Sequence, residues 1–212
     1  MNNIVEIIAT NPGEPEMNLV DRVTSALESG GLVVAPTETQ YALMARADSQ
    51  EAIDRVYRVK RRPASMPTSV FVRSVTAAQT YGKLNRIAAK LAESYLPGPL
   101  TLVVPSNGLE QVAPDGRIGL RVSSSAFIMA LTTQAGFPIT ATSACLSGQP
   151  QKATAADIAT EFVGDVELYI DGGVLDGQAS TVVDCCGERP VVLREGVIPS
   201  LEIEAMVRGA LT

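Results

Sequence analysis

The sequence predicts an α/β (α+β) fold: a single domain in which one twisted, mixed β-sheet is flanked by helices. Short apolar runs that fit strands alternate along the chain with longer segments of helical periodicity. The 212 residues are 46% hydrophobic and only 4% aromatic, without Trp, so the core is expected to be aliphatic. Because no repeat, low-complexity tract or Pro/Ser-rich linker divides the chain, we expect one domain over residues 1–212.

Helices are predicted where apolar residues recur every three or four positions and a stop signal follows. In the first of them, Leu19, Val23 and Leu27 share one face, and the glycine pair at 30 and 31 ends the helix. In chain order, the predicted helices are 17–29, 49–60, 84–95, 124–135, 154–162 and about 200–210.

Strands are predicted where short apolar or alternating runs lie between turn residues. "LVVA" at 32–35 is typical of a buried strand, and "RIGLRVS" at 117–123 alternates as a strand with two different faces does. In chain order, the predicted strands are 4–9, 32–35, 41–47, 68–73, 97–106, 117–123, a segment ending near 139, 166–170, 180–185 and 190–195.

The residue types exclude several kinds of chemistry. The chain has no His, which rules out Ser-His-Asp and Cys-His catalysis, His-ligated zinc and the usual general base at neutral pH. Catalysis must therefore use Lys, Arg, acidic or hydroxyl side chains, the backbone or a hard metal ion. Neither a Walker A nor a G-x-G-x-x-G motif occurs, so nucleotide binding would not be of the P-loop or Rossmann kind.

Net charge and cysteine content limit the partners and the cellular location that we expect. The formal net charge is -6, so any contact with nucleic acid must be local. No run of 18 apolar residues and no signal-peptide pattern is present, and we expect no membrane segment. Three cysteines, two of them adjacent, do not make a disulfide framework, which favours a reducing, cytoplasmic location.

The strongest charge feature is "RVYRVKRRP" at 55–63, where a helix must end before Pro63. One interpretation is a solvated helix terminus whose cations complement the helix dipole. The other is a polyphosphate site, because Lys60 and Arg62 lie two residues apart and can point at one anion. Both interpretations stay open at this point.

Hydroxyl side chains follow apolar runs in three places: "VVAPTETQYA" at 33–42, "ITATSACLSGQP" at 139–150 and "ASTVVD" at 179–184. They are either ordinary turn caps or the lining of a polar pocket at the strand ends. Arg121 is a separate case, because Leu120 and Val122 share one face of its strand and Arg121 lies on the other. If that face is buried, the Arg121 cation needs an anionic partner.

Taken in order, these segments resemble the YrdC/Sua5/YciO family over residues 16–200, roughly. The matching motifs are "GGLVVAPTETQYAL", Lys60-Arg61-Arg62-Pro63, "PGPLT", Arg121-Val122, "SACLSGQP", "STVVD" and "LREG". Each motif is weak by itself, but all of them in register are specific. The resemblance implies a YrdC-like fold with a positively charged concave surface. It also implies a threonylcarbamoyl-AMP synthase-like nucleotidyltransferase, which makes threonylcarbamoyl-AMP from ATP, bicarbonate and L-threonine for t6A modification of tRNA.

The resemblance also implies roles for particular residues. Thr39, Arg121, Ser143 and Ser180 would hold threonine. Lys60, Arg62 and Arg194 would hold the phosphates, with Lys60 and Arg62 as catalytic residues and Mg²⁺ accompanying ATP. No metal-ligating residues are expected. Other proteins of the t6A pathway would be partners.

The chain departs from the family pattern at four positions of the implied site. Cys145 stands where family synthases usually carry an Asn that contacts the nucleotide, and a thiol is a weak hydrogen-bond partner. Gln40 and Ala42 replace the usual Val and Gly, and Phe71 stands where many members have a polar residue.

These departures leave an alternative function open: a YciO-like paralogue with weak or altered activity that binds nucleotide, or double-stranded RNA at a basic concavity. The carbamoyl-transfer domain of hydrogenase-maturation proteins is a third, weaker possibility. We expect no additional C-terminal domain of the longer Sua5 type.

Overall fold

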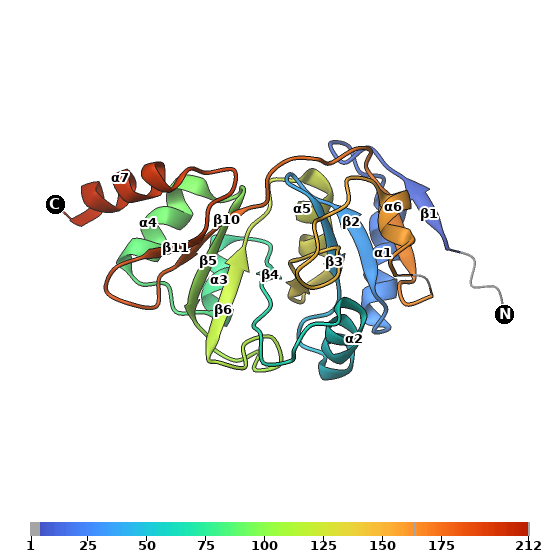
Figure 1. Cartoon of the computed structure of the whole chain (residues 1–212), viewed down its shortest axis with the longest axis horizontal. Helices are drawn as coiled ribbons and strands as arrows, with labels where there is room; N and C mark the ends of the chain where they lie inside the picture. Colours follow the sequence, from blue (N-terminus) through green and yellow to red (C-terminus); the bar gives the residue numbers. More distant parts are fainter. Residues whose placement is uncertain (1–4, 163, 212) are drawn as a thin grey trace.

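The computed structural model describes residues 5–162 and 164–211 (Figure 1). Its strands are β1 (Ile7–Ala9), β2 (Val33–Pro36), β3 (Tyr41–Met44), β4 (Val70–Phe71), β5 (Leu100–Pro105), β6 (Arg117–Arg121), β7 (Ile139–Thr140), β8 (Thr142–Ser143), β9 (Leu168–Asp171), β10 (Thr181–Asp184) and β11 (Val191–Arg194). Its helices are α1 (Met17–Glu28), α2 (Gln50–Lys60), α3 (Val75–Tyr81), α4 (Arg86–Tyr95), α5 (Ala126–Ala135), α6 (Ala155–Ala159) and α7 (Ser200–Leu211). Residue 4 of the predicted first strand lies outside the described residues.

The strands pair in both directions, as predicted, but they form two sheets and not one. Sheet A has the order β1-β9-β2-β3-β8, and sheet B has the order β11-β10-β5-β6-β4-β7. The sheets separate at residues 139–143, because β7 pairs with β4 in sheet B and β8 pairs with β3 in sheet A. An isolated bridge between Arg46 and Ile139 connects the two edges. The predicted mixed α/β fold is therefore confirmed, with its strands divided between two sheets.

Helices cover the two sheets differently (Figure 1). Sheet A is buried on both faces: α1 and α5 pack on one face through residues such as Leu27 and Leu131, and α2 and α6 pack on the other. This double burial explains why β2 and β3 contain hardly any polar residues. Sheet B is covered on one face by α3, α4 and α7. Its other face is free to line a site.

The alternation along sheet B decides which side chains reach that free face. Leu100 and Leu102 of β5 point into the core with Leu120 of β6, so Thr101 and Arg121 point the other way. The register places Val182 beside Thr101 and Phe71 beside Arg121. The free face of sheet B therefore carries a hydroxyl and a guanidinium group.

Most predicted elements are present, and one helix was missed. The missed element is α3, which Ser74 caps by accepting a hydrogen bond from the Ala77 N–H at 3.0 Å. Helix α3 has seven residues, of which Ala78 alone is fully buried. It therefore has too little apolar periodicity to be recognised in the sequence.

Candidate functional site

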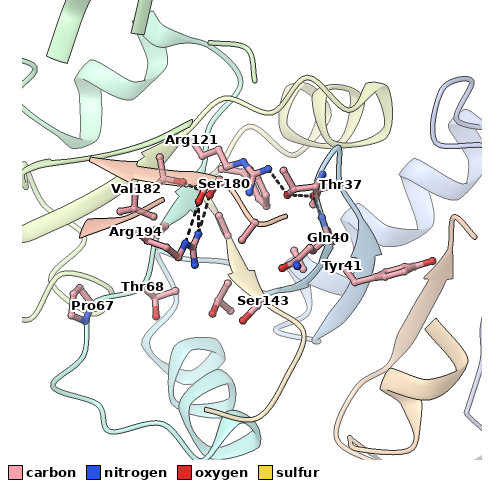
Figure 2. Close-up of a pocket in the computed structure, with 18 of the residues that line it drawn as sticks. Thr37, Gln40, Tyr41, Pro67, Thr68, Arg121, Ser143, Ser180, Val182 and Arg194 are labelled. Carbon is pink, nitrogen blue, oxygen red and sulfur yellow. Dashed lines mark hydrogen bonds between the residues drawn. The ribbon is translucent and has the colours of Figure 1, made fainter. Parts of the chain in front are cut away.

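A hollow of about 160 Å³ lies between the free face of sheet B and the ends of β3 and β8 (Figure 2). Its walls are made mainly of hydroxyl side chains, together with three arginines and one carboxamide. None of the described residues that line it is acidic. The polar lining residues are Thr37, Thr39, Gln40, Tyr41, Arg62, Thr68, Ser69, Thr101, Arg121, Thr142, Ser143, Ser180 and Arg194.

Thr37 folds the turn between β2 and β3 into the shape that lines the hollow. Its Oγ1 donates to the Gln40 carbonyl at 2.6 Å and accepts from the backbone N–H groups of Thr39 and Gln40. It also lies 3.0 Å from the Thr39 Oγ1. The hydroxyl of Thr37 therefore holds the local backbone, while Thr39 presents its hydroxyl to the site.

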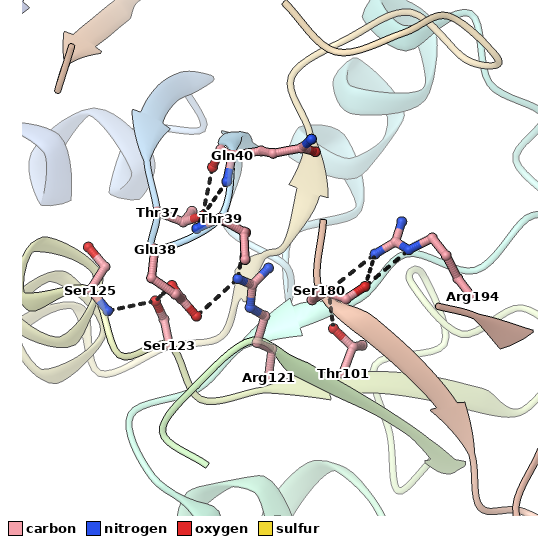
Figure 3. A network of polar contacts seen from close by, with 10 residues as sticks. All are labelled: Thr37, Glu38, Thr39, Gln40, Thr101, Arg121, Ser123, Ser125, Ser180 and Arg194. Atoms are coloured by element: carbon pink, nitrogen blue, oxygen red, sulfur yellow. Dashed lines mark hydrogen bonds and ion pairs between the residues drawn. The ribbon is translucent and has the colours of Figure 1, made fainter. Parts of the chain in front are cut away.

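Arg121 is buried, and the anionic partner expected for it is Glu38 (Figure 3). Its Nη2 donates to Glu38 Oε1 at 3.0 Å and to Thr39 Oγ1 at 2.8 Å. The guanidinium also lies over the ring of Phe71, with 5.3 Å between Cζ and the ring centroid. Its Nε is buried without a protein partner. Nη1 makes no hydrogen bond to a described residue, so Arg121 keeps this donor for the hollow that it lines.

Glu38 is held by more than its ion pair. Its second carboxylate oxygen accepts a short hydrogen bond from the Ser123 hydroxyl, and Ser123 Oγ in turn accepts from the Ser125 N–H at 3.2 Å. The Glu38 side chain is only 14% exposed. The position of the Arg121 guanidinium is thus fixed through Glu38 by the start of helix α5.

Ser180 and Arg194 form a second polar group on the opposite wall. The Arg194 guanidinium donates to the Ser180 carbonyl at 2.9 Å and to its hydroxyl at 3.1 Å. Ser180 Oγ lies 3.0 Å from Thr101 Oγ1. Burial, and then the positive charge of Arg121, lower the pKa of Arg194. The charge of Arg121 is thus felt at Arg194 across the hollow.

The basic run at 55–63 divides into side chains with different surroundings. Arg55 pairs with Glu167 at 2.7 Å, whereas Arg58 and Arg61 are exposed. Arg62 lines the hollow, and its Nη2 donates to the Pro67 carbonyl at 2.8 Å while its Nε has no protein partner. Of the run, Arg62 is placed to meet an anion in the hollow.

Lys60 lies beneath the turn that follows β8 and does not line the hollow. It is 1% exposed, and its ammonium donates to the Cys145 carbonyl at 2.7 Å and to the Ser143 carbonyl. Its own carbonyl accepts from the Ser147 N–H at 2.9 Å. Burial lowers the pKa of Lys60 to about 8. Lys60 thus joins the end of α2 to the turn at 143–147.

The turn itself presents a hydroxyl to the site and keeps its thiol inside. Ser143 lines the hollow, whereas Cys145 is 6% exposed and does not. The Ser143 Oγ lies 3.1 Å from the Cys145 Sγ. Cys145 therefore contacts the site through Ser143.

The other unusual positions all border the hollow. Gln40 reaches across to the segment between β9 and β10, where its Nε2 donates to the Gly177 carbonyl at 2.8 Å. Ala42 and Phe71 contribute apolar surface to the same space. Gln40, Ala42 and Phe71 therefore lie around the same hollow.

The described residues offer no resident metal site, since no three Asp, Glu or Cys side chains come together among them. In the same part of the chain, no helix has both the length and the apolar composition needed to cross a bilayer.

Sequence reasoning placed most of the site but missed Glu38 and Thr101. Glu38 had a usable signal, because a buried Arg121 requires an anion and Glu38 is the acid in the "PTET" turn. Thr101 had none, since its role follows from the pairing of β5 with β10.

The chain resembles known proteins in sequence and in fold. The family model Sua5_yciO_yrdC, described as "Telomere recombination", matches residues 25–196. The putative threonylcarbamoyl-AMP synthase of Methanocaldococcus jannaschii is 30% identical over 200 residues, covering 93% of this chain and 95% of that protein.

Two solved structures resemble the whole chain. Pyrococcus abyssi Sua5 complexed with L-threonine superposes with a TM-score of 0.88 at 32% identity, covering 96% of this chain. This chain spans only 61% of that Sua5 chain. Escherichia coli YciO superposes with a TM-score of 0.86 at 26% identity, covering 94% of this chain and 99% of YciO.

Proposed function

This chain belongs to the Sua5/YciO/YrdC family, and from that membership we propose that it is a threonylcarbamoyl-AMP synthase-like enzyme. It uses ATP, bicarbonate and L-threonine and releases threonylcarbamoyl-AMP and pyrophosphate. The product serves the t6A modification of tRNA, in which other proteins of the pathway carry out the transfer.

One observation carries the proposal: three guanidinium groups and many hydroxyls share a hollow whose described lining contains no carboxylate. Such a space attracts anions, and its hydroxyls can bind polar groups of a small ligand. An amino-acid carboxylate and a nucleotide triphosphate are both anionic. The family membership selects these two among the possible anions.

Threonine fits the wall made by Arg121 and Thr39. The Nη1 of Arg121, which makes no hydrogen bond to a described residue, is a donor for the threonine carboxylate, and the ion pair with Glu38 keeps the guanidinium in place. Ser143 and Ser180 line the same hollow and supply hydroxyls for the remaining polar groups of threonine.

The phosphates of ATP fit the part of the hollow bordered by Arg62 and Arg194. In the described structure both guanidinium groups bond only to backbone carbonyls and to Ser180, so neither charge is neutralised by a protein carboxylate. Lys60 would support this part indirectly, because it holds the turn at 143–147 from beneath. Direct contact of Lys60 or Cys145 with nucleotide would require that turn to move.

The chemistry requires positioning and charge neutralisation more than a protein base. The threonine amine adds to carbon dioxide and loses a proton to solvent, or condenses with bicarbonate and releases water, to give a carbamate. A carbamate oxygen then attacks the α-phosphorus of ATP, and the bond to the leaving pyrophosphate breaks. Arginines that face the reacting groups stabilise the negative charge that builds up in this step, which suits an active site without His. Mg²⁺ bound to the phosphates would add to that neutralisation.

Cys145 favours a second candidate function, a YciO-like paralogue with weak or altered activity. The buried thiol is bonded to Ser143 and does not face the hollow, so it offers a nucleotide little. YciO itself matches nearly the full length of both chains. In this case the hollow would still bind a nucleotide, or the surface around it would bind double-stranded RNA.

The direct test is to incubate the purified protein with ATP, Mg²⁺, bicarbonate and threonine and to detect threonylcarbamoyl-AMP and pyrophosphate by mass-resolved chromatography. Arg121→Gln should abolish threonine binding in calorimetry. Arg62→Gln should weaken ATP binding, whereas the matched control Arg58→Gln, at an exposed residue of the same basic run, should not.

The outcomes separate the candidates. Threonine-dependent product from the native protein supports the synthase. Product from Cys145→Asn alone identifies Cys145 as the site of functional divergence and supports the paralogue. No product from either protein, together with RNA binding that weakens steeply with salt, would reject the synthase in favour of an RNA-binding role.

A further inference from the structure

The two ends of the hollow differ in charge although both contain arginine. At one end, Arg121 is paired with Glu38 at 3.0 Å. Arg194 on the opposite wall, and Arg62, which also lines the hollow, make no ion pair with any residue that the structure describes; their bonds go to the carbonyls of Pro67 and Ser180 and to the Ser180 hydroxyl. The electrostatic potential is therefore lower at the Arg121 end.

Glu38 cannot relieve this difference by turning away. One carboxylate oxygen is bonded to Arg121 and the other to Ser123, and Ser123 is itself tied to the Ser125 N–H of the turn before α5. The side chain is 14% exposed, so water screens its charge poorly. Figure 3 shows Glu38 beside Arg121, on the side away from Ser180 and Arg194. The negative charge is thus a fixed part of the site.

Arg121 still has the capacity to bind a ligand, because it lines the hollow and its Nη1 makes no hydrogen bond to a described residue, whereas Nη2 is bonded to Glu38 and Thr39. An anion on that donor is separated from Glu38 by a single guanidinium group. It would be attracted by Arg121 and repelled by Glu38 at the same time. The attraction is the larger because Arg121 is closer, but the net attraction is reduced.

The energy of an ion in a potential scales with its charge, so the difference between the two ends counts once for a carboxylate and about 1.5 to 2 times for a terminal phosphate group. We propose that Glu38 is a specificity-determining residue that keeps phosphate groups off Arg121 and so reserves this donor for a singly charged carboxylate. This inference rests on the proposed function and adds to it the means by which two anionic substrates are kept in their own places. Glu38 acts by weakening the binding of a phosphate group at Arg121, and it adds no contact to the threonine carboxylate.

The test measures binding in solution and does not need turnover. Native protein, Glu38→Gln and the matched control Glu28→Gln are titrated with pyrophosphate and with L-threonine in a calorimeter. Glu28 is exposed on α1, and its replacement changes the net charge equally. In the native protein and the control, saturating pyrophosphate should leave the apparent Kd for threonine nearly unchanged. In Glu38→Gln, the same pyrophosphate should raise that Kd about ten-fold or more.

Two further variants separate charge from structure. Ser123→Ala removes a hydrogen bond of Glu38 but keeps its charge, so pyrophosphate should still not compete with threonine. Glu38→Ala removes the charge without requiring an amide to fit the site, and it replaces Glu38→Gln if circular dichroism shows that the Gln variant does not fold. A loss of packing would weaken every ligand, whereas the expected change is tighter binding of pyrophosphate.

Pyrophosphate titration alone also distinguishes this inference from the proposed function. If the native protein binds no threonine, the proposed function fails, yet a folded Glu38 variant that gains affinity or stoichiometry for pyrophosphate still supports the role of Glu38. A folded variant that binds pyrophosphate like the native protein, and shows no new competition, overturns the inference.

Discussion

Burial of Lys60 should make the stability of the protein depend on pH in an unusual direction. The ordinary pKa of a lysine, 10.5, is lowered to about 8 in the fold, chiefly because the ammonium is removed from water. Between pH 8 and 10.5 the unfolded chain holds this proton and the folded chain does not. Stability from this group should thus rise with pH across that window.

The magnitude follows from the difference between the two pKa values. At about 1.4 kcal/mol per pH unit, a change from 10.5 to about 8 corresponds to about 3 kcal/mol of unfolding free energy. This cost of the buried charge is fully present below pH 8 and is removed as the pH approaches 10.5. Charged and titratable neighbours act in both directions, since Cys145 and Glu161 raise the pKa and Arg62 lowers it.

The assay compares urea unfolding of the native protein and of Lys60→Met at half-unit steps from pH 7 to 10. Groups whose pKa the fold raises, such as Cys186 at about 11, destabilise both proteins equally at high pH and cancel in the difference. The native-minus-variant difference should rise by up to about 3 kcal/mol in favour of the native protein. A difference that is flat or falls with pH would refute the reasoning.

Three further predictions concern the backbone around the site. Arg61 ends α2 with φ at 50°, a left-handed conformation that glycine adopts more easily, so Arg61→Gly should stabilise the protein by about 1 kcal/mol in urea unfolding. Gly196→Ala should lower the unfolding free energy by about 2 kcal/mol and weaken threonine binding. The new Cβ would lie 2.1 Å from the Ala179 carbonyl oxygen and displace β10, the strand that follows Ala179. Gln40→Val removes the hydrogen bond to Gly177 and should speed hydrogen exchange at residues 176–178 several-fold.

Each of these predictions has a matched control. Arg58→Gly places the same glycine in regular helix and should destabilise by about 1 kcal/mol, so a similar loss at position 61 would contradict the strain argument. Gly209→Ala adds a Cβ with nothing within 4 Å; if it costs as much as Gly196→Ala, the close contact at 196 is not the cause. Gln178→Ala should leave exchange near Gly177 unaltered, and equal acceleration would assign the protection to something other than Gln40.

The sequence allowed the elements of the site to be predicted because their signals are local. Hydroxyls after apolar runs identified Thr39, Ser143 and Ser180, and strand alternation placed Arg121 on the face opposite Leu120. The same reasoning required an anion for Arg121, and the structure supplies Glu38. These inferences need only the period of a strand and the cost of burying a charge.

Features that depend on pairing between distant segments could not be predicted. Lys60 and Arg62 look equivalent in a basic run, yet one supports the 143–147 turn and the other lines the hollow. The split into two sheets arises because a five-residue stretch pairs with β4 at its start and with β3 at its end. The periodicity of the sequence does not indicate which strand a short strand pairs with.

That stretch has a mechanical consequence for the hollow. Ala141 is the single residue between β7 and β8, and its N–H is bonded to the Ser69 carbonyl at 2.7 Å. The Arg46–Ile139 bridge and the bond from the Thr140 N–H to the Ala45 carbonyl at 3.0 Å also join the edges of the two sheets there. Sliding of one sheet past the other would therefore break backbone hydrogen bonds on both sides of Ala141. Arg121 of β6 donates to Thr39 Oγ1 at 2.8 Å, so this direct contact between the sheets also sets the angle between them and with it the width of the hollow.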